Sequence, residues 1–116
     1  LGDSVKIGNF VEVKKSKIAS NTNACHLTYI GDSEIGSGVN VGAGTITANY
    51  NHMTKAKNKT TINDGASIGS NSVLVAPVEI GESATVGAGT VLTKNVNDKA
   101  LAVARAPMRI IENYVK

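Results

Sequence analysis

The sequence predicts an all-β fold, a parallel β-helix of triangular cross-section, from its repeat and its composition. An apolar residue returns every five or six positions along almost the whole chain, commonly followed by Gly, and a small or β-branched residue stands four places later. A hexapeptide period of this kind is typical of a parallel β-helix, whose stacked coils bury the recurring residues. The 116 residues fit one small domain, and the 3% aromatic content suits a narrow prism.

The openings of the repeat indicate three strands in each coil. They fall at residues 1, 7 and 13, then 18, 24 and 30, then 35, 41 and 47, and later at 62, 68 and 74, then 80, 86 and 92. The partners at the fourth place include Val5, Val11, Thr22, Thr28, Val39, Thr45, Val78 and Thr90. Openings and partners together are the predicted core, and three sides complete one turn of the helix.

The repeat is interrupted once, at residues 48–61, which we expect to form a loop ejected from the helix. Loops of this length inside a compact domain are usually functional or disordered, and insertions in repeat proteins tend to gather on the binding face. The period resumes after the loop. We align the later openings with the earlier ones so that Ile62, Ile68 and Leu74 follow Ile35, Val41 and Thr47.

The two ends of the chain differ from the repeat. The period stops after Val96, which places the β-helix domain at residues 1–97 and a C-terminal arm at residues 98–116. Within the arm, residues 107–114 are expected to form a short helix that caps the prism, with a proline near its first turn. The chain begins in phase at Leu1 without a capping segment, which indicates a fragment cut from a longer protein.

Charge and cysteine content narrow the functional classes. The net charge is +3, with one lysine cluster at residues 14–17 and another at Lys55, Lys57 and Lys59. Without interleaved aromatic residues these clusters do not favour nucleic acid, and they are either solvated or bind phosphates of small ligands. Cys25 is the only cysteine, so there is no intrachain disulfide. No long apolar run or signal pattern points to a membrane, and a cytoplasmic location is the expectation.

The phase of the repeat also predicts which side chains point outward. His26 is third in the hexad opened by Ala24 and is expected to face solvent, because Ala24 and Thr28 occupy the inward positions. Neighbouring strands lie about 4.8 Å apart, so residues in the same place of successive coils form a column. The residues that continue the column of His26 are Ala43, Ser70 and Ala88. We therefore predict a groove, floored by small side chains, that leads away from the histidine.

Other polar side chains are predicted near His26. Glu12 and Tyr29 share an outward position in neighbouring coils, and Lys14 is expected just around the corner from Glu12. Asn40 is expected as the corner residue immediately before the next strand. A base, a carboxylate, a phenol, an amide and an ammonium group should therefore converge on one patch about two coils high.

The groove and the histidine favour acyl transfer from an extended thioester such as acetyl-CoA. Exposed backbone N–H groups along the groove, for instance at Ala43, can bind the arm of the thioester and stabilise a tetrahedral oxyanion. An imidazole titrates near pH ~6.5 and can take a proton from an attacking amine or hydroxyl. Glu12 is expected to orient the ring of His26.

Three stretches carry a resemblance to a known family. Residues 9–15, residues 26–32, which begin His-Leu-Thr-Tyr, and residues 40–50 resemble the acetyltransferase domain of the bacterial bifunctional N-acetylglucosamine-1-phosphate uridyltransferase and glucosamine-1-phosphate acetyltransferase. This family lies within the hexapeptide-repeat acyltransferases. The resemblance implies a left-handed helix and a homotrimer with active sites between subunits. It also implies an N-terminal uridyltransferase domain with a Mg²⁺ site, which this chain does not contain.

The resemblance further implies roles for individual residues. His26 would be the general base in transfer of acetyl from acetyl-CoA to the amino group of glucosamine 1-phosphate. Lys14, Tyr29 and Asn40 would hold the sugar phosphate. The implied contacts of acetyl-CoA are Ala43, Asn49, Tyr50, Ser70, Ala88 and Arg105. An arginine that the family uses for the sugar phosphate would lie upstream of Leu1.

Two other functions stay open at this stage. One is a hexapeptide acyltransferase with another amino-sugar or hydroxyl acceptor, and the other is a β-solenoid that performs no chemistry. A β-helix carbonic anhydrase is disfavoured, because it needs three histidines for its metal and the chain has only His26 and His52. We therefore expect no metal site in this domain.

Overall fold

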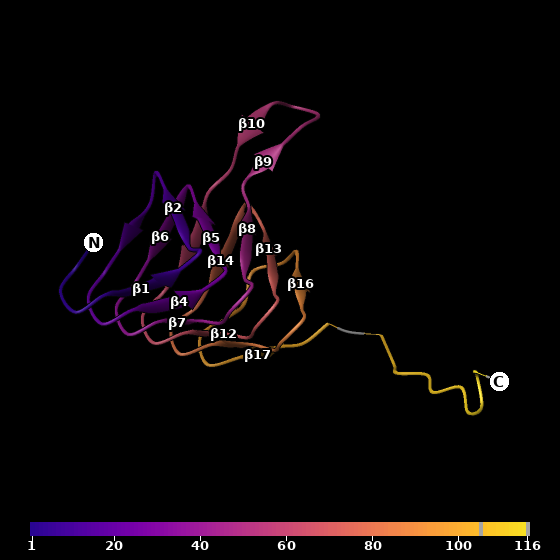
Figure 1. Cartoon of the computed structure of the whole chain (residues 1–116). Helices are drawn as coiled ribbons and strands as arrows, with labels where there is room; N and C mark the ends of the chain where they lie inside the picture. Colours follow the sequence, from indigo (N-terminus) through magenta and orange to yellow (C-terminus); the bar gives the residue numbers. More distant parts are fainter. Residues whose placement is uncertain (105, 116) are drawn as a thin grey trace.

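The structure is a computed structural model that describes residues 1–104 and 106–115, and it is a parallel β-helix (Figure 1). Successive short strands follow the three sides of a coil, and each side becomes a parallel sheet as the coils stack. The predicted three-sided all-β architecture is confirmed. Each coil therefore adds one strand to a side of the prism. This stacking places residues from distant parts of the sequence next to one another.

Three parallel sheets form the sides of the prism. Sheet A consists of β1 (Lys6–Asn9), β4 (Asn23–His26), β7 (Asn40–Val41), β12 (Ser67–Ile68), β15 (Thr85–Val86) and β17 (Leu101–Ala102). Sheet B consists of β2 (Glu12–Lys14), β5 (Tyr29–Gly31), β8 (Ile46–Ala48), β13 (Val73–Val75) and β16 (Val91–Leu92). Sheet C consists of β3 (Lys17–Ile18), β6 (Ser33–Ile35), β11 (Thr60–Ile62) and β14 (Val78–Ile80).

The register between coils is the one that the repeat predicts, even across the interruption. One backbone pair on each side of the prism tests the alignment, and the pairs are Ile62 with Ile35, Ile68 with Val41, and Leu74 with Thr47. The chain therefore leaves the helix after one coil and returns to the same phase in the next. Every column predicted from the period is preserved on both sides of the insertion.

The core is a narrow stack of the predicted apolar and threonine residues. Most openings of the hexads from the second coil onward, among them Ile30, Leu74 and Ile80, are almost completely buried. Two buried threonines donate to corner carbonyls, Thr22 Oγ1 to Gly36 O at 2.7 Å and Thr45 Oγ1 to Gly42 O at 2.7 Å. An unpaired buried hydroxyl would cost roughly 1–3 kcal/mol, so these hydrogen bonds offset the cost of burying Thr22 and Thr45.

The corner between sheets A and B requires the left-handed region of backbone conformation in each coil. The residues that turn it are Phe10 (φ 60°), Leu27 (φ 46°), Gly44 (φ 79°), Asn71 (φ 58°) and Gly89 (φ 73°). Non-glycine residues rarely adopt this conformation, and the two apolar ones in the series lie in adjacent coils. The corner therefore falls directly after the position that His26 occupies.

Glycine on sheet A meets a different requirement, the close approach of neighbouring coils. A Cβ atom on Gly42 would lie 2.6 Å from the carbonyl oxygen of Ile68 and 2.6 Å from the backbone nitrogen of Ser70. The Gly42 N–H donates to that same carbonyl at 2.8 Å. Only a residue without a side chain therefore lets the two coils approach closely enough to form this hydrogen bond.

The ejected segment is a β-hairpin. Its strands β9 (Tyr50–Asn51) and β10 (Ala56–Lys57) pair in antiparallel fashion and project away from the prism (Figure 1). Asn58 N–H donates to Asn49 O at 2.7 Å and closes the neck of the hairpin. The predicted bounds of 48–61 are too wide, because β8 and β11 extend the parallel ladders into both ends of that range.

The C-terminal part differs from the expectation in two ways. The coil continues past residue 97, since Val96 bridges to Ile80 and β17 pairs with β15. The predicted terminal helix is wrong: residues 106–115 contain no helix and run away from the prism (Figure 1). A helix this short is marginal without packing, and the side chains of the arm are exposed. The arm therefore does not cap the prism.

The described part of the chain also holds no helix with the length and apolar character needed to cross a membrane.

Candidate active site

A column of four residues on sheet A contains the candidate base. His26 is exposed at the end of β4, and the same place in the next three coils is occupied by Ala43, Ser70 and Ala88. Hydrogen bonds between the coils fix this stacking, namely Gly44 N–H to His26 O at 3.3 Å, Asn71 N–H to Ala43 O at 2.8 Å and Gly89 N–H to Ser70 O at 2.8 Å. The predicted column of small residues beside His26 is thus present.

The backbone around His26 is held from two sides. Thr28 Oγ1 donates to His26 O at 2.7 Å, and this carbonyl also accepts the N–H of Gly44 from the next coil. Leu27 then turns the chain away with its positive φ. The imidazole therefore stands directly before the corner of the prism and is exposed to solvent.

The other predicted site residues lie on two different sides of the prism. Asn40 is on sheet A, within β7 and not at a corner, and pairs with Asn23. Glu12 pairs with Tyr29 on sheet B, as predicted, but Lys14 lies in the same strand as Glu12 and not around a corner from it. The turn occurs earlier, at Phe10, because that residue takes the left-handed conformation.

This placement divides the predicted patch within one chain. His26 and Asn40 belong to sheet A, whereas Glu12, Lys14 and Tyr29 belong to sheet B, beyond the corner. In the described part of the chain, no hydrogen bond joins the Glu12 carboxylate to the imidazole. A single copy therefore presents the base and Asn40 on one face and the other predicted phosphate ligands, Lys14 and Tyr29, on the adjacent face.

Asn49 and Tyr50 stand at the neck of the hairpin but differ in orientation. Asn49 is only 8% exposed, and its Nδ2 donates to Asp32 Oδ2 at 2.6 Å and to Tyr29 Oη at 3.3 Å. Tyr50 is 54% exposed in β9. The sequence reasoning missed Asp32, since it lies on a corner where the repeat assigns no inward or outward role. Arg105, also predicted as a contact of acetyl-CoA, lies outside the described residues.

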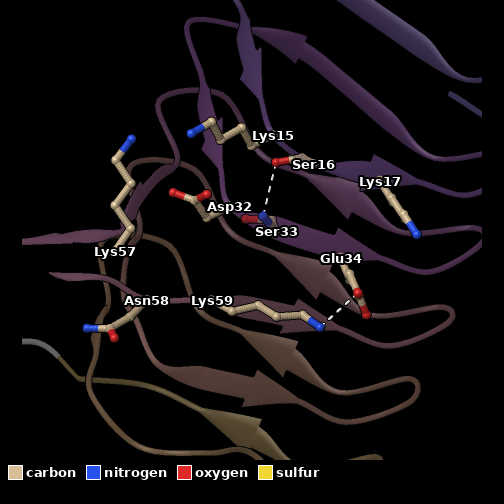
Figure 2. Close-up of a pocket in the computed structure, with 9 residues that line it drawn as sticks. All are labelled: Lys15, Ser16, Lys17, Asp32, Ser33, Glu34, Lys57, Asn58 and Lys59. Carbon is tan, nitrogen blue, oxygen red and sulfur yellow. Dashed lines mark hydrogen bonds and ion pairs between the residues drawn. The ribbon is translucent and has the colours of Figure 1, made fainter.

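A pocket of about 460 Å³ lies where the hairpin meets the corner between sheets B and C (Figure 2). Its lining includes Lys15 and Lys57, which lie on the same side of the pocket as Asp32 in Figure 2. Lys59 is engaged elsewhere, because its Nζ lies 2.8 Å from Glu34 Oε1. The hydrogen bond and charge of Lys59 lower the pKa of the Glu34 carboxyl below its ordinary value.

Metal-binding side chains do not gather in the described part of the chain, where no three His, Cys, Asp or Glu residues come together. The chemistry available at His26 is therefore that of an exposed imidazole beside a track of small residues. The backbone N–H groups of Ala43 and Ser70 donate no hydrogen bond to the described residues, which leaves them free to bind a ligand laid along the column.

Comparison with known proteins relates this chain to bacterial transferases. The family model described as bacterial transferase hexapeptide (six repeats) matches residues 59–94. The chain is 60% identical to the bifunctional protein GlmU of Alcanivorax borkumensis and to that of Cellvibrio japonicus, in each case over 114 residues. Each match covers 98% of this chain and 25% of the relative, so the chain spans about a quarter of the length of these relatives.

A solved structure with the same fold is the S84A mutant of AntD, an N-acyltransferase from Bacillus cereus, in complex with coenzyme A and dTDP-4-amino-4,6-dideoxyglucose. It superposes with a TM-score of 0.80 over 95% of this chain and 70% of AntD, at 22% identity. At this level of identity, the match shows that AntD and this chain share a fold.

The repeat, the stacked parallel sheets and the matching family model define a hexapeptide-repeat protein of the bacterial transferase type. Within that type, the chain matches the C-terminal region of GlmU proteins over nearly its whole length.

Proposed function

We propose that this chain is an acetyltransferase that moves acetyl from acetyl-CoA to the amino group of glucosamine 1-phosphate, giving N-acetylglucosamine 1-phosphate, a step towards UDP-N-acetylglucosamine. The observation that carries the proposal is the exposed His26 at the head of a column of small residues, in a chain 60% identical to bifunctional GlmU proteins. The column suits the long arm of a thioester co-substrate. AntD supports this use of the fold, since it binds coenzyme A.

The chemistry proposed for His26 is general base catalysis. The amine of the sugar attacks the thioester carbonyl, and the imidazole takes the proton that the nitrogen loses. The tetrahedral intermediate then collapses and expels the thiolate of coenzyme A. The free N–H groups of Ala43 and Ser70 point to how the oxyanion or the pantetheine arm could be bound, since preorganised backbone donors stabilise developing negative charge.

The division of the site between two faces supports a homotrimer with active sites between subunits. Sheet A of one copy would supply the base His26 together with Asn40, and sheet B of a neighbouring copy would supply Lys14 and Tyr29. The sugar phosphate would thus be held by Asn40 from one copy and by Lys14 and Tyr29 from the other. In this arrangement Glu12 of the neighbour, and not of the same copy, would orient the imidazole. The proposal also assigns the acetyl-CoA contacts to Ala43, Asn49, Tyr50, Ser70, Ala88 and Arg105, with a cytoplasmic location.

Exposed apolar residues support the same association. Phe10 is 83% exposed and Leu27 61% exposed at the corner between sheets A and B, and Ile46 and Val91 are exposed on the outer surface of sheet B. Apolar groups that form a continuous exposed surface commonly mark a protein interface. A second copy laid against sheet B would remove this surface from water and place the two halves of the site opposite each other.

The test of the proposed function is an assay of free thiol release from acetyl-CoA in the presence of glucosamine 1-phosphate. We expect turnover, and we expect His26→Ala to reduce kcat by roughly 10²–10⁴-fold while the circular dichroism spectrum is unchanged. His52→Ala, in the exposed hairpin, is the matched control and should leave turnover unchanged. Full activity of His26→Ala would rule out the assigned base.

The alternatives give different results in the same experiments. Turnover with another amino sugar, but not with glucosamine 1-phosphate, would favour a different acceptor. Absence of acetyl-CoA binding by calorimetry, in this chain and in a version extended upstream, would favour a solenoid without chemistry. Light scattering measures the oligomeric state directly, and a monomer at assay concentration that still turns over substrate would contradict the site between subunits.

A further inference from the structure

Three side chains from different parts of the sequence form a chain of hydrogen bonds beside the proposed sugar-phosphate residues. Asp32 Oδ2 accepts from Asn49 Nδ2 at 2.6 Å, and the same Nδ2 donates to Tyr29 Oη at 3.3 Å. Asp32 lies at a corner next to β5, Asn49 at the neck of the hairpin and Tyr29 on sheet B. Asn49 is almost fully buried, so its amide has little competition from water.

The carboxylate determines which way round the amide of Asn49 lies. An ionised carboxylate only accepts hydrogen bonds, so the group of Asn49 that faces Asp32 must be the NH₂ and not the carbonyl oxygen. One N–H is then used by Asp32, and the second is directed at Tyr29. The phenol oxygen of Tyr29 therefore accepts a hydrogen bond, and its own proton remains to be donated to another group.

The space around Gly31 keeps the phenol in this place. A Cβ atom on Gly31 would touch Tyr29 Oη and would lie 2.6 Å from Asn49 Nδ2. The ring of Tyr29 thus lies back over Gly31, which pairs with Lys14 in the adjacent strand. Lys14 and Tyr29 are consequently diagonal neighbours on adjacent strands of sheet B.

We propose that Asp32 is a positioning residue, which acts through Asn49 to make the Tyr29 hydroxyl a hydrogen-bond donor towards the phosphate of the sugar substrate. The inference rests on the proposed function and adds to it a residue that touches neither substrate. It also assigns the Asn49 side chain to the sugar-phosphate side of the site. Only the backbone of Asn49 is then available for acetyl-CoA.

A structural role is the competing explanation, and it makes a different prediction. The backbone of Asn49 also closes the hairpin by accepting from Asn58 N–H at 2.7 Å, so loss of Asp32 could act by loosening the hairpin alone. In that case the effect of an Asp32 substitution would be independent of Tyr29. If Asp32 acts by directing the phenol, its effect must vanish once the phenol is absent.

Steady-state kinetics on four proteins separates the two explanations. We expect Asp32→Asn to raise the KM for glucosamine 1-phosphate about tenfold or more, with kcat and the KM for acetyl-CoA within twofold of wild type. Tyr29→Phe should give a similar rise. Asp32→Asn added to Tyr29→Phe should change the KM by less than twofold. An equal effect of Asp32→Asn in both backgrounds, or none in the wild-type background, would overturn the proposal.

The matched control is Glu34→Gln. It removes one negative charge two positions further along the chain, from a carboxylate that pairs with Lys59 and not with Asn49. This variant should leave all three kinetic constants unchanged. A rise of the sugar-phosphate KM in Glu34→Gln equal to that in Asp32→Asn would indicate a general effect of charge and would also overturn the proposal.

A measurement without substrate keeps the inference separate from the proposed function. In the wild-type chain, both protons of the Asn49 side-chain amide are hydrogen-bonded, so nuclear magnetic resonance should find them protected from exchange with water. Asp32→Asn should remove this protection, and Tyr29→Phe should remove it for one proton. If neither this chain nor the version extended upstream turns over substrate, the proposed function fails, and these exchange rates still decide whether the network exists. Unprotected protons in the wild-type chain would refute it.

Discussion

Replacement of Gly42 by alanine tests whether the close stacking of coils on sheet A stabilises the protein. The added Cβ would lie 2.6 Å from Ile68 O and from Ser70 N, whereas ordinary van der Waals contact begins at 3.4 Å. The backbone of Gly42 is not in the left-handed region, so alanine can adopt this backbone conformation and the destabilising effect is steric. To relieve the contact, the two coils must separate locally by about 0.8 Å.

That separation breaks a specific hydrogen bond. The Gly42 N–H to Ile68 O distance of 2.8 Å would become about 3.6 Å, which is no longer a hydrogen bond. The net loss of the bond is about 1 kcal/mol, and a buried carbonyl left without a partner costs about 1–3 kcal/mol. We therefore expect Gly42→Ala to lower the free energy of unfolding by about 2–4 kcal/mol.

The assay is urea denaturation followed by circular dichroism, at one chain concentration for all variants because association also contributes to stability. Gly38→Ala is the matched control. A Cβ on Gly38 meets no atom within 4 Å, but its φ is +67°, so the expected loss is only the conformational cost of about 1–2 kcal/mol. A loss for Gly42→Ala that is equal to or smaller than that of Gly38→Ala would refute the stacking argument.

Three further predictions concern the site, the interface and the surface charge. Ser70→Leu places a large side chain in the column of small residues, and it should raise the KM for acetyl-CoA at least about tenfold, measured by steady-state kinetics; an unchanged KM would move the co-substrate off this column. Ile46→Glu puts a charge on the exposed apolar surface of sheet B and should lower the mass found by light scattering, whereas an unchanged mass would exclude this face as the interface. The folded-state pKa of Glu34 is lowered by Lys59, so the ion pair stabilises the protein above the unfolded pKa and loses this effect as the pH falls through the folded one. Glu34→Gln should therefore slightly reduce the urea midpoint at pH 7 and not at pH ~3, and a larger reduction in acid would contradict this sign.

The period predicts the fold well because burial alone determines it. An inward residue at each opening is sufficient to set the register of all three sheets, and Leu74 pairs with Thr47 as the period requires despite the inserted hairpin. The column from His26 to Ala88 follows from the same register. These features depend on which residues are apolar, and the sequence contains that information directly.

The corners were harder to predict, because they depend on backbone conformation and not on burial. Phe10 and Leu27 turn the chain with positive φ although neither is a residue that favours it. The period therefore places the corner too late, between Glu12 and Lys14, which in the structure share one strand. Asp32, on another corner, has no assigned place in the repeat, and its hydrogen bond to Asn49 depends on how the hairpin folds back.

The terminal helix failed for a different reason. Residues 107–114 have a composition compatible with a helix, but a segment of that length requires an apolar surface to pack on. Nothing in the repeat says whether the last coil offers one, and the described arm lies away from the prism. The helix propensity of these residues was therefore insufficient to predict a helix, because tertiary contacts decide whether so short a segment becomes helical.

The closure of the coil beneath the hairpin makes the hairpin an independent module. Ile62 follows its partner Ile35 by 27 positions, whereas Ile35 follows Ile18 by 17, yet both pairs occupy the same register. Since the entropy of closing a loop rises only slowly with its length, hairpins of other lengths can leave from this corner at little cost. A hairpin transplanted from another transferase would thus alter what projects beside the site while the columns of the prism, and the base they align, remain unchanged.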